Sequence, residues 1–193
     1  MTGFGRSLFA ASFSAVLTAC AQLAPTAPDA DPAAVLTRED LSPGFVGFIG
    51  PKAQHAPLFL DTPGTNFYCL RSFVDRRTGE TTHQLYVSDS YFGPERDWNA
   101  ARDSRGMPLP FVSVSRDEIT CDNGCSYLEE FAATLPESEL AANPDGLAVT
   151  FAAHSGDAKT IRLSGKQIAA QLATVAAKRN PARPVSAFTA TSP

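Results

Sequence analysis

The chain has 193 residues and a slight acidic excess, with 16 lysines and arginines against 20 aspartates and glutamates, and a formal net charge of −4. No stripe of lysine and arginine runs through it, whereas a nucleic-acid-binding surface needs clustered cations to displace phosphate counterions. We therefore expect no nucleic-acid partner. The length and the 44% of hydrophobic residues suit one globular domain that folds without a cofactor or metal.

The first twenty residues have the layout of an export signal. Arg6 supplies a positive charge, an apolar run follows, and small residues lead into Cys20. The stretch Leu17-Thr18-Ala19-Cys20 resembles the lipobox of bacterial lipoproteins, which implies cleavage before Cys20 and acylation of its thiol. The resemblance also implies the outer membrane as destination, because Ala21 is not the acidic residue that marks inner-membrane retention. We thus expect a signal peptide over residues 1–19 and a periplasm-facing domain anchored through its lipid.

Two other interpretations of this segment stay open. Ala19 and Ala21 also fit an ordinary small-residue cleavage site, which would release a soluble secreted protein. A membrane-spanning helix is the third interpretation, although the apolar run is too short to cross about 30 Å of hydrocarbon. For the lipoprotein, several acyl chains on one cysteine would give the stable anchoring that a single chain does not.

Residues 20–43 are rich in alanine and proline and hold few large apolar side chains. Such a composition cannot bury enough surface to offset the entropy of ordering, so it predicts a tether. One helical turn is considered over residues 32–41, because Asp31 can cap it and Pro32 suits its first position. We place the globular domain at residues 44–179 and expect a disordered tail at residues 180–193.

Strand signals dominate the first part of this domain. We expect an irregular strand or close-packed loop over residues 44–50 and a short strand over residues 57–60. The clearest signal is a β-hairpin, in which residues 66–74 and 82–91 flank the turn Asp75-Arg76-Arg77-Thr78-Gly79. Residues 92–108 resemble a loop, with a helical turn over residues 97–102. A further strand is expected from Phe111 towards Ile119.

The second part of the domain combines strands with helices. Residues 126–135 fit both a helix and a strand by periodicity, and we favour the strand because the preceding turn and strand need a partner. A short helix over residues 136–142 and strands over residues 147–153 and 160–163 follow. Ser164 and Gln167 form a capping-box pair before a helix that ends near Lys178, with an apolar stripe of Ile168, Leu172 and Val175. The pattern predicts an α+β domain: an antiparallel sheet of about six strands with this C-terminal helix packed on one face.

The cysteines offer the main chemical alternatives. Cys121 and Cys125 flank a three-residue turn and are predicted to form a structural disulfide, which an oxidising periplasm permits. Pairing of Cys69 with either of them stays open; otherwise Cys69 is expected as a buried, small apolar residue. The C-x3-C spacing also resembles, over five residues, the copper-binding pair of membrane-tethered copper chaperones. Zinc bound by the three thiols and His83 is chemically allowed, so a metal- or thiol-handling protein is the alternative function.

No nucleophile motif with a positioned base indicates a hydrolase. His83 and His154 are expected as surface or hydrogen-bonded residues, and Glu129 as an arginine-paired or edge carboxylate, with a raised pKa if it points inward. The aromatic residues near the hairpin are expected in the core and rim more than in a ligand platform: Tyr86, Tyr91, Phe92 and Trp98. The leading expectation is a lipid-anchored envelope protein of structural or partner-binding type, with the membrane and an unidentified envelope protein as partners.

Overall fold

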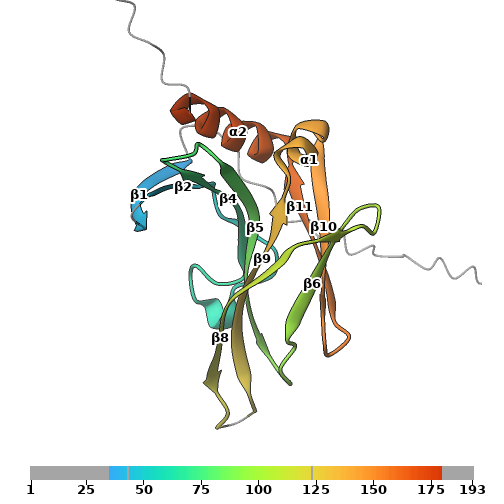
Figure 1. Ribbon diagram of the computed structural model, residues 1–193. Helices are drawn as coiled ribbons and strands as arrows, with labels where there is room; N and C mark the ends of the chain where they lie inside the picture. Colours follow the sequence, from blue (N-terminus) through green and yellow to red (C-terminus); the bar gives the residue numbers. More distant parts are fainter. Residues whose placement is uncertain (1–34, 43, 123, 180–193) are drawn as a thin grey trace, which may run out of the picture.

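The computed structural model describes residues 35–42, 44–122 and 124–179, and these form mostly antiparallel β-sheet with a C-terminal helix packed on it (Figure 1). Sheet A has the strand order β1-β2-β4-β5-β9-β8, with the short β3 paired to β4. Its strands are β1 (Leu36–Ser42), β2 (Phe45–Ile49), β3 (Ala53–Gln54), β4 (Phe67–Asp75), β5 (Thr81–Phe92), β8 (Phe111–Thr120) and β9 (Ser126–Leu135). Sheet B has the order β11-β10-β6-β7, built from β6 (Trp98–Asp103), β7 (Pro108–Leu109), β10 (Gly146–Ala153) and β11 (Ala158–Ser164).

Sheet B is the main departure from the single sheet that the sequence predicts. The helical turn expected over residues 97–102 is wrong, because this segment forms β6 and pairs with β10, with Ala101 opposite Phe151. A register shift beside Trp98 breaks the period-two pattern, and Asp103 is buried although it is charged. A bulged strand with an inward carboxylate does not alternate between apolar and polar residues, so its sequence looks like a loop.

Two further segments differ from expectation. The short strand expected over residues 57–60 is wrong: the strand is β3, and Phe59–Asp61 form a 3-10 turn in which Leu60 has a φ of 49°. Leu36–Ser42, where a tether with a helical turn was considered, instead pair with β2 as an edge strand of sheet A, so the sheet begins before Gly44. Cys20, the signal segment and the tail over residues 180–193 lie outside the described residues.

The hairpin of β4 and β5 is confirmed, with Phe73 opposite Thr82. Its turn depends on Asp75, whose Oδ1 accepts the amides of Arg77 at 2.7 Å and Thr78 at 3.1 Å. Gly79 closes the turn with a φ of 74°, a conformation that costs glycine little. Residues 126–135 form strand β9, as favoured, because β9 pairs with β5 on one side and with β8 on the other.

The main core fills the space between the two sheets. Phe131 from sheet A contacts Phe151 from sheet B edge-on at a ring distance of 4.9 Å, and Trp98 lies 5.2 Å from Phe131. All three side chains are buried. Burial of such aromatic side chains contributes most of the apolar area removed from water, so this contact holds sheet B against sheet A.

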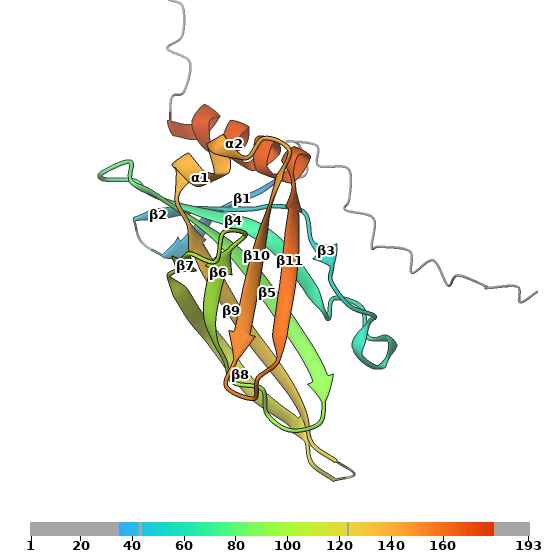
Figure 2. The same cartoon turned by 90° about the vertical axis from the view of Figure 1, so that its right-hand side faces the viewer.

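Helix α2 (Gly165–Arg179) lies across the ends of both sheets, next to the short α1 (Glu137–Ala142) (Figures 1 and 2). The capping box is confirmed: the Ser164 amide donates to Gln167 Oε1 at 2.9 Å, and the Gln167 amide donates to Ser164 Oγ at 3.2 Å. Ile168 and Val175 of the predicted stripe are buried, and Leu172 is half-buried. The helix therefore covers one end of the sandwich that the two sheets form. Polar side chains lie at the opposite end.

Candidate functional site

The end of the sandwich opposite α2 holds a buried group of polar side chains, the Asp89 cluster: His55, Asp89, Arg96, Trp98 and Lys159. They come from the segment after β3, from β5, from the segment before β6, from β6 itself and from β11. The Asp89 carboxylate is only 2% exposed and accepts hydrogen bonds from Lys159 Nζ, from Arg96 Nη1 at 2.9 Å and from the Trp98 indole at 3.1 Å. Two cations, one from β11 and one from the segment before β6, thus compensate one buried carboxylate.

His55 extends the Asp89 cluster towards the edge of sheet B. Its Nε2 donates to the Ser88 carbonyl at 2.9 Å, so this nitrogen carries the proton and Nδ1 accepts from Lys159 Nζ at 3.2 Å. Burial lowers the pKa of His55, and the charge of Lys159 lowers it further. Burial also lowers the pKa of Lys159, against the attraction of Asp89. The neutral imidazole and the ammonium group can therefore lie side by side.

Glu129 lies directly opposite Asp89 in the ladder between β5 and β9, with its side chain facing inward. Its carboxylate accepts the amides of Asp97 at 3.0 Å and Trp98 at 3.1 Å, and the hydroxyl of Tyr91. Arg116 Nε lies 3.7 Å from the same carboxylate. These contacts fix the start of β6 against sheet A, so Glu129 positions the strand that carries Trp98.

A small cavity of about 220 Å³ opens beside the Asp89 cluster. Tyr91 and Trp98 form its aromatic walls, and Asp89, Arg96, Asp157 and Lys159 supply its charges. Arg96 also lies over the Tyr91 ring at 4.0 Å. The volume is below the roughly 300–1,000 Å³ of ordinary small-molecule pockets. The lining charges already pair with each other, so we assign no ligand to this cavity.

A larger cleft of about 530 Å³ lies beside β11 and is also lined by residues 145–148 at the start of β10. Thr160, Arg162 and Ser164 of β11 form one side, and Gln54, His55 and Tyr68 of sheet A and the segment after β3 form the other. The Tyr68 hydroxyl crosses the cleft and donates to the Arg162 carbonyl at 2.9 Å. Since His55 lines the cleft and contacts Lys159, the Asp89 cluster supports one wall of it.

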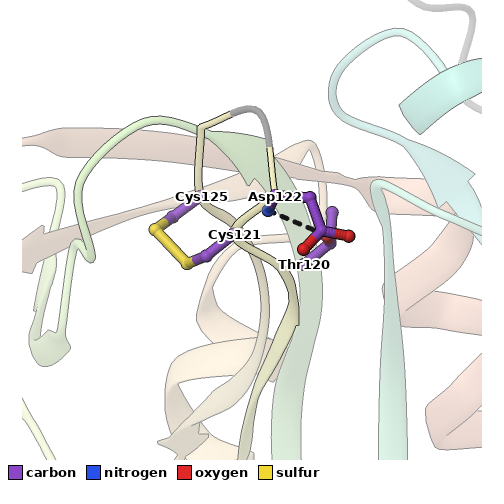
Figure 3. Close-up of a disulfide and its surroundings, with 4 residues drawn as sticks. All are labelled: Thr120, Cys121, Asp122 and Cys125. Carbon is purple, nitrogen blue, oxygen red and sulfur yellow. Dashed lines mark hydrogen bonds between the residues drawn. A yellow bond between two sulfur atoms is a disulfide. The ribbon is translucent and has the colours of Figure 1, made fainter.

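The structure places the predicted cysteines far from this cleft. Cys121 and Cys125 form a disulfide at the tip of the β8–β9 hairpin, where the Asp122 amide donates to Thr120 Oγ1 at 3.3 Å (Figure 3). Cys69 lies buried in β4, unpaired with either of them, and burial raises the pKa of its thiol to about 11. Within residues 35–42, 44–122 and 124–179, no three histidine, cysteine or acidic side chains are placed to share a metal ion.

The other residues singled out in the sequence are dispersed. His83 is buried under α1 and α2; its Nδ1 accepts from Ser72 Oγ at 2.8 Å and its Nε2 donates to Glu137 at 3.2 Å. His154 is exposed and bonds to Asp97. Of the four aromatic residues, Tyr91 and Trp98 reach the small cavity. Tyr86 bonds to Glu130 on the outer face of sheet A, and the Phe92 ring contacts the Phe59 ring at a centroid distance of 4.7 Å.

Comparison with protein-family models, with curated proteins and with solved structures finds no match for this chain. Among the described residues, neither helix has the length and apolar character that crossing a bilayer requires. The cleft and the Asp89 cluster therefore carry the functional argument by their own geometry.

Sequence reasoning missed Asp89 and Lys159, although the sequence contains a signal for both. Asp89 follows Val87 at the inward-facing parity of β5, and Lys159 precedes Ile161 at the inward-facing parity of β11. A charged residue at a core-facing position needs a charged partner. The two strands lie in different sheets, and only their packing shows that these two residues are each other's partners.

The buried histidines predict a pH dependence of stability. Because burial lowers the pKa values of His55 and His83 in the folded domain, the unfolded chain binds protons that the folded domain does not. The free energy of unfolding should therefore fall as the pH decreases below about 6.5, by at most about 1.4 kcal/mol per pH unit for each imidazole. Urea unfolding between pH 7.5 and pH 5 measures this slope.

The variants His55→Gln and His83→Gln provide the control, since each removes one of the two titrating groups. Each should reduce the slope above pH 5, whatever it does to the absolute stability. The carboxyl group of Glu137, whose pKa is lowered mainly by its bonds to Arg179, contributes only at lower pH. An unchanged slope in the double variant would show that other groups control the pH dependence.

Proposed function

We propose that this chain is a lipid-anchored protein of the bacterial cell envelope whose domain binds a protein partner in the cleft along β11. The observation that carries the proposal is the cleft itself, about 530 Å³ beside a strand that pairs on one side only. Backbone groups and polar side chains reach the cleft from two sheets. We assign the domain to the α+β class, with two antiparallel sheets closed at one end by α2.

The anchoring half of the proposal rests on the sequence before the domain. Leu17-Thr18-Ala19-Cys20 follows a basic residue and an apolar run, as in the lipoproteins that it resembles. A lipid on Cys20 would hold the domain at the periplasmic side of the outer membrane. The Cys121–Cys125 disulfide supports an oxidising compartment, because such bonds are rare in the cytosol.

Replacing Cys20 with alanine tests the anchor. The variant should lose the mass of the acyl chains and should no longer partition into detergent with outer-membrane proteins, since the acylated thiol is gone. Fractionation of envelopes and intact-mass measurement check both effects, with Cys69→Ala as the matched control that keeps the lipid. Membrane association and mass shift that persist in Cys20→Ala would contradict the lipoprotein assignment.

A further inference from the structure

The edge of β11 directs alternate backbone groups into the cleft. Thr160 lies opposite Thr150 of β10 with the two hydroxyls 2.8 Å apart. The Arg162 carbonyl accepts from Tyr68, and the Ser164 amide donates to Gln167, neither of which belongs to β10. Because every second residue of a strand directs its N–H and C=O to the same side, Thr160, Arg162 and Ser164 all face away from β10.

Part of this edge has no hydrogen-bond partner among the described residues. The N–H and C=O of Thr160 and the N–H of Arg162 have no hydrogen-bond partner within this part of the chain. Donors and acceptors that recur every two residues, about 6.7 Å apart, match the backbone of another β-strand.

Two of the other free edges, β7 and β8, are less able to accept a strand. β7 has two residues and begins with Pro108, which lacks an N–H. β8 contains two register irregularities and a charged run over residues 116–118. By contrast, β11 pairs with β10 over seven consecutive positions without a register shift and contains no proline.

We propose that the partner inserts an extended segment into the cleft, where it pairs with β11 as a further strand of sheet B. The inference rests on the proposed function and specifies how the partner binds. The inserted strand would lie over β3 and the start of β4, which extend beyond β11 in Figure 2. The inserted strand would displace the Tyr68 hydroxyl from the Arg162 carbonyl, because these two groups lie 2.9 Å apart across the cleft.

The side chains on the edge specify the segment further. Arg162 is exposed on the outer face of sheet B and has no ion-pair partner among the described residues. An acidic residue opposite it would form a favourable cross-strand pair. On the inner side, the core residues Ile161 and Leu163 of β11 and Leu147 of β10 back the cleft, so an inward-pointing side chain of the inserted strand would meet apolar groups. The partner segment should therefore alternate apolar residues with polar ones that include an acidic residue.

The probe is the acetylated heptapeptide Val-Thr-Val-Glu-Val-Thr-Val, titrated into the full mature chain and followed by amide hydrogen exchange. Binding should slow exchange at Thr160 and Arg162 at least tenfold and leave Ile161 and Leu163 unchanged, because these two already pair with β10. Two further peptides carry methyl groups on backbone nitrogens: one on its valines, the other on its threonines and glutamate. One of the two should bind like the unmodified peptide and the other at least tenfold more weakly, because only one edge of the peptide faces β11.

Two variants of the chain complete the test. Thr160→Pro removes an N–H outside the β10 ladder, so it should keep the fold and weaken the peptide at least tenfold. Arg162→Glu should likewise weaken this peptide, and exchange of the peptide glutamate for lysine should restore binding to it. The charge reversal tests the proposal independently if the proline variant does not fold.

Four outcomes would overturn strand addition. The first is no exchange effect at millimolar peptide, and the second is equal binding of both N-methylated peptides. The third is protection of Thr160 that grows with protein concentration together with a dimer in sedimentation, which would mean that a second copy of the chain occupies the edge. The fourth is protection of the Thr160 amide in the free monomer that disappears when residues 180–193 are removed, which would mean that the chain's own C-terminal segment occupies the edge. A crosslink from the cleft to an envelope protein alongside the second outcome would leave the proposed function standing and reject only this binding mode.

Discussion

Replacement of Lys159 with methionine should lower the free energy of unfolding by about 3 kcal/mol or more. The variant removes one of the two cations bonded to the Asp89 carboxylate, which is 2% exposed and keeps its hydrogen bonds from Arg96 and the Trp98 indole. Loss of one partner of a buried ion pair costs about 3–5 kcal/mol, because the remaining charge lies in a medium that solvates it poorly. Urea unfolding at pH 7.5 measures the loss.

The double variant Asp89→Leu, Lys159→Met separates the ion pair from the packing of the two side chains. In the double variant the buried Asp89 carboxylate is absent as well, so the loss of Lys159 leaves no carboxylate without its cation. The double variant should therefore lower the free energy of unfolding by at least about 1 kcal/mol less than the sum of the two single variants. Arg96 is 26% exposed and can turn to solvent. Additive single-variant effects would show that Asp89 and Lys159 do not stabilise the fold as a pair.

Replacement of Glu129 with leucine should have an effect at least as large, about 4 kcal/mol. The carboxylate accepts two backbone amides and the Tyr91 hydroxyl, and each buried donor without an acceptor costs about 1–3 kcal/mol. Glu129→Gln keeps one acceptor oxygen and should lose about half as much. The start of β6 should exchange its amides first in the leucine variant, since these bonds hold the strand to sheet A.

The neighbouring residue supplies the matched control. Glu130 points to the opposite face of sheet A, where it accepts from Tyr86 and from Ser115 at 2.9 Å and is half-buried. Water can replace the carboxylate there, so Glu130→Leu should cost less than about 2 kcal/mol. Equal losses in the two leucine variants would mean that Glu129 has no special role in holding the two sheets together.

The elements that the sequence predicts correctly have local causes. The turn of the β4–β5 hairpin depends on Asp75 and Gly79 within one short stretch, and the start of α2 depends on Ser164 and Gln167, three residues apart. The Cys121–Cys125 disulfide closes across a single tight turn. In each case the interacting groups are close in sequence, so residue type and spacing are sufficient to predict the structure.

Sheet B and the cleft depend on contacts that are distant in sequence. β6 pairs with β10 about fifty positions later, and its bulge removes the alternation that would mark it as a strand. The cleft exists because β11 stops short of covering β3 and β4, which depends on the position of one sheet over the other. The predicted site residues Cys20, Cys121 and Cys125 lie outside the described residues or far from the cleft, so residue type alone does not locate this site.

Site-specific photocrosslinking in intact envelopes tests partner binding in the cleft most directly. A photoreactive amino acid at Arg162 lies on the outer face of β11, at the edge that borders the cleft, and the same amino acid at Asn99 lies exposed on β6 of the same sheet as a control. Partner binding along β11 predicts one discrete crosslinked protein from Arg162, none from Asn99, and loss of the product when Cys20→Ala removes the anchor. No product from Arg162, or the same products from both positions, would contradict it.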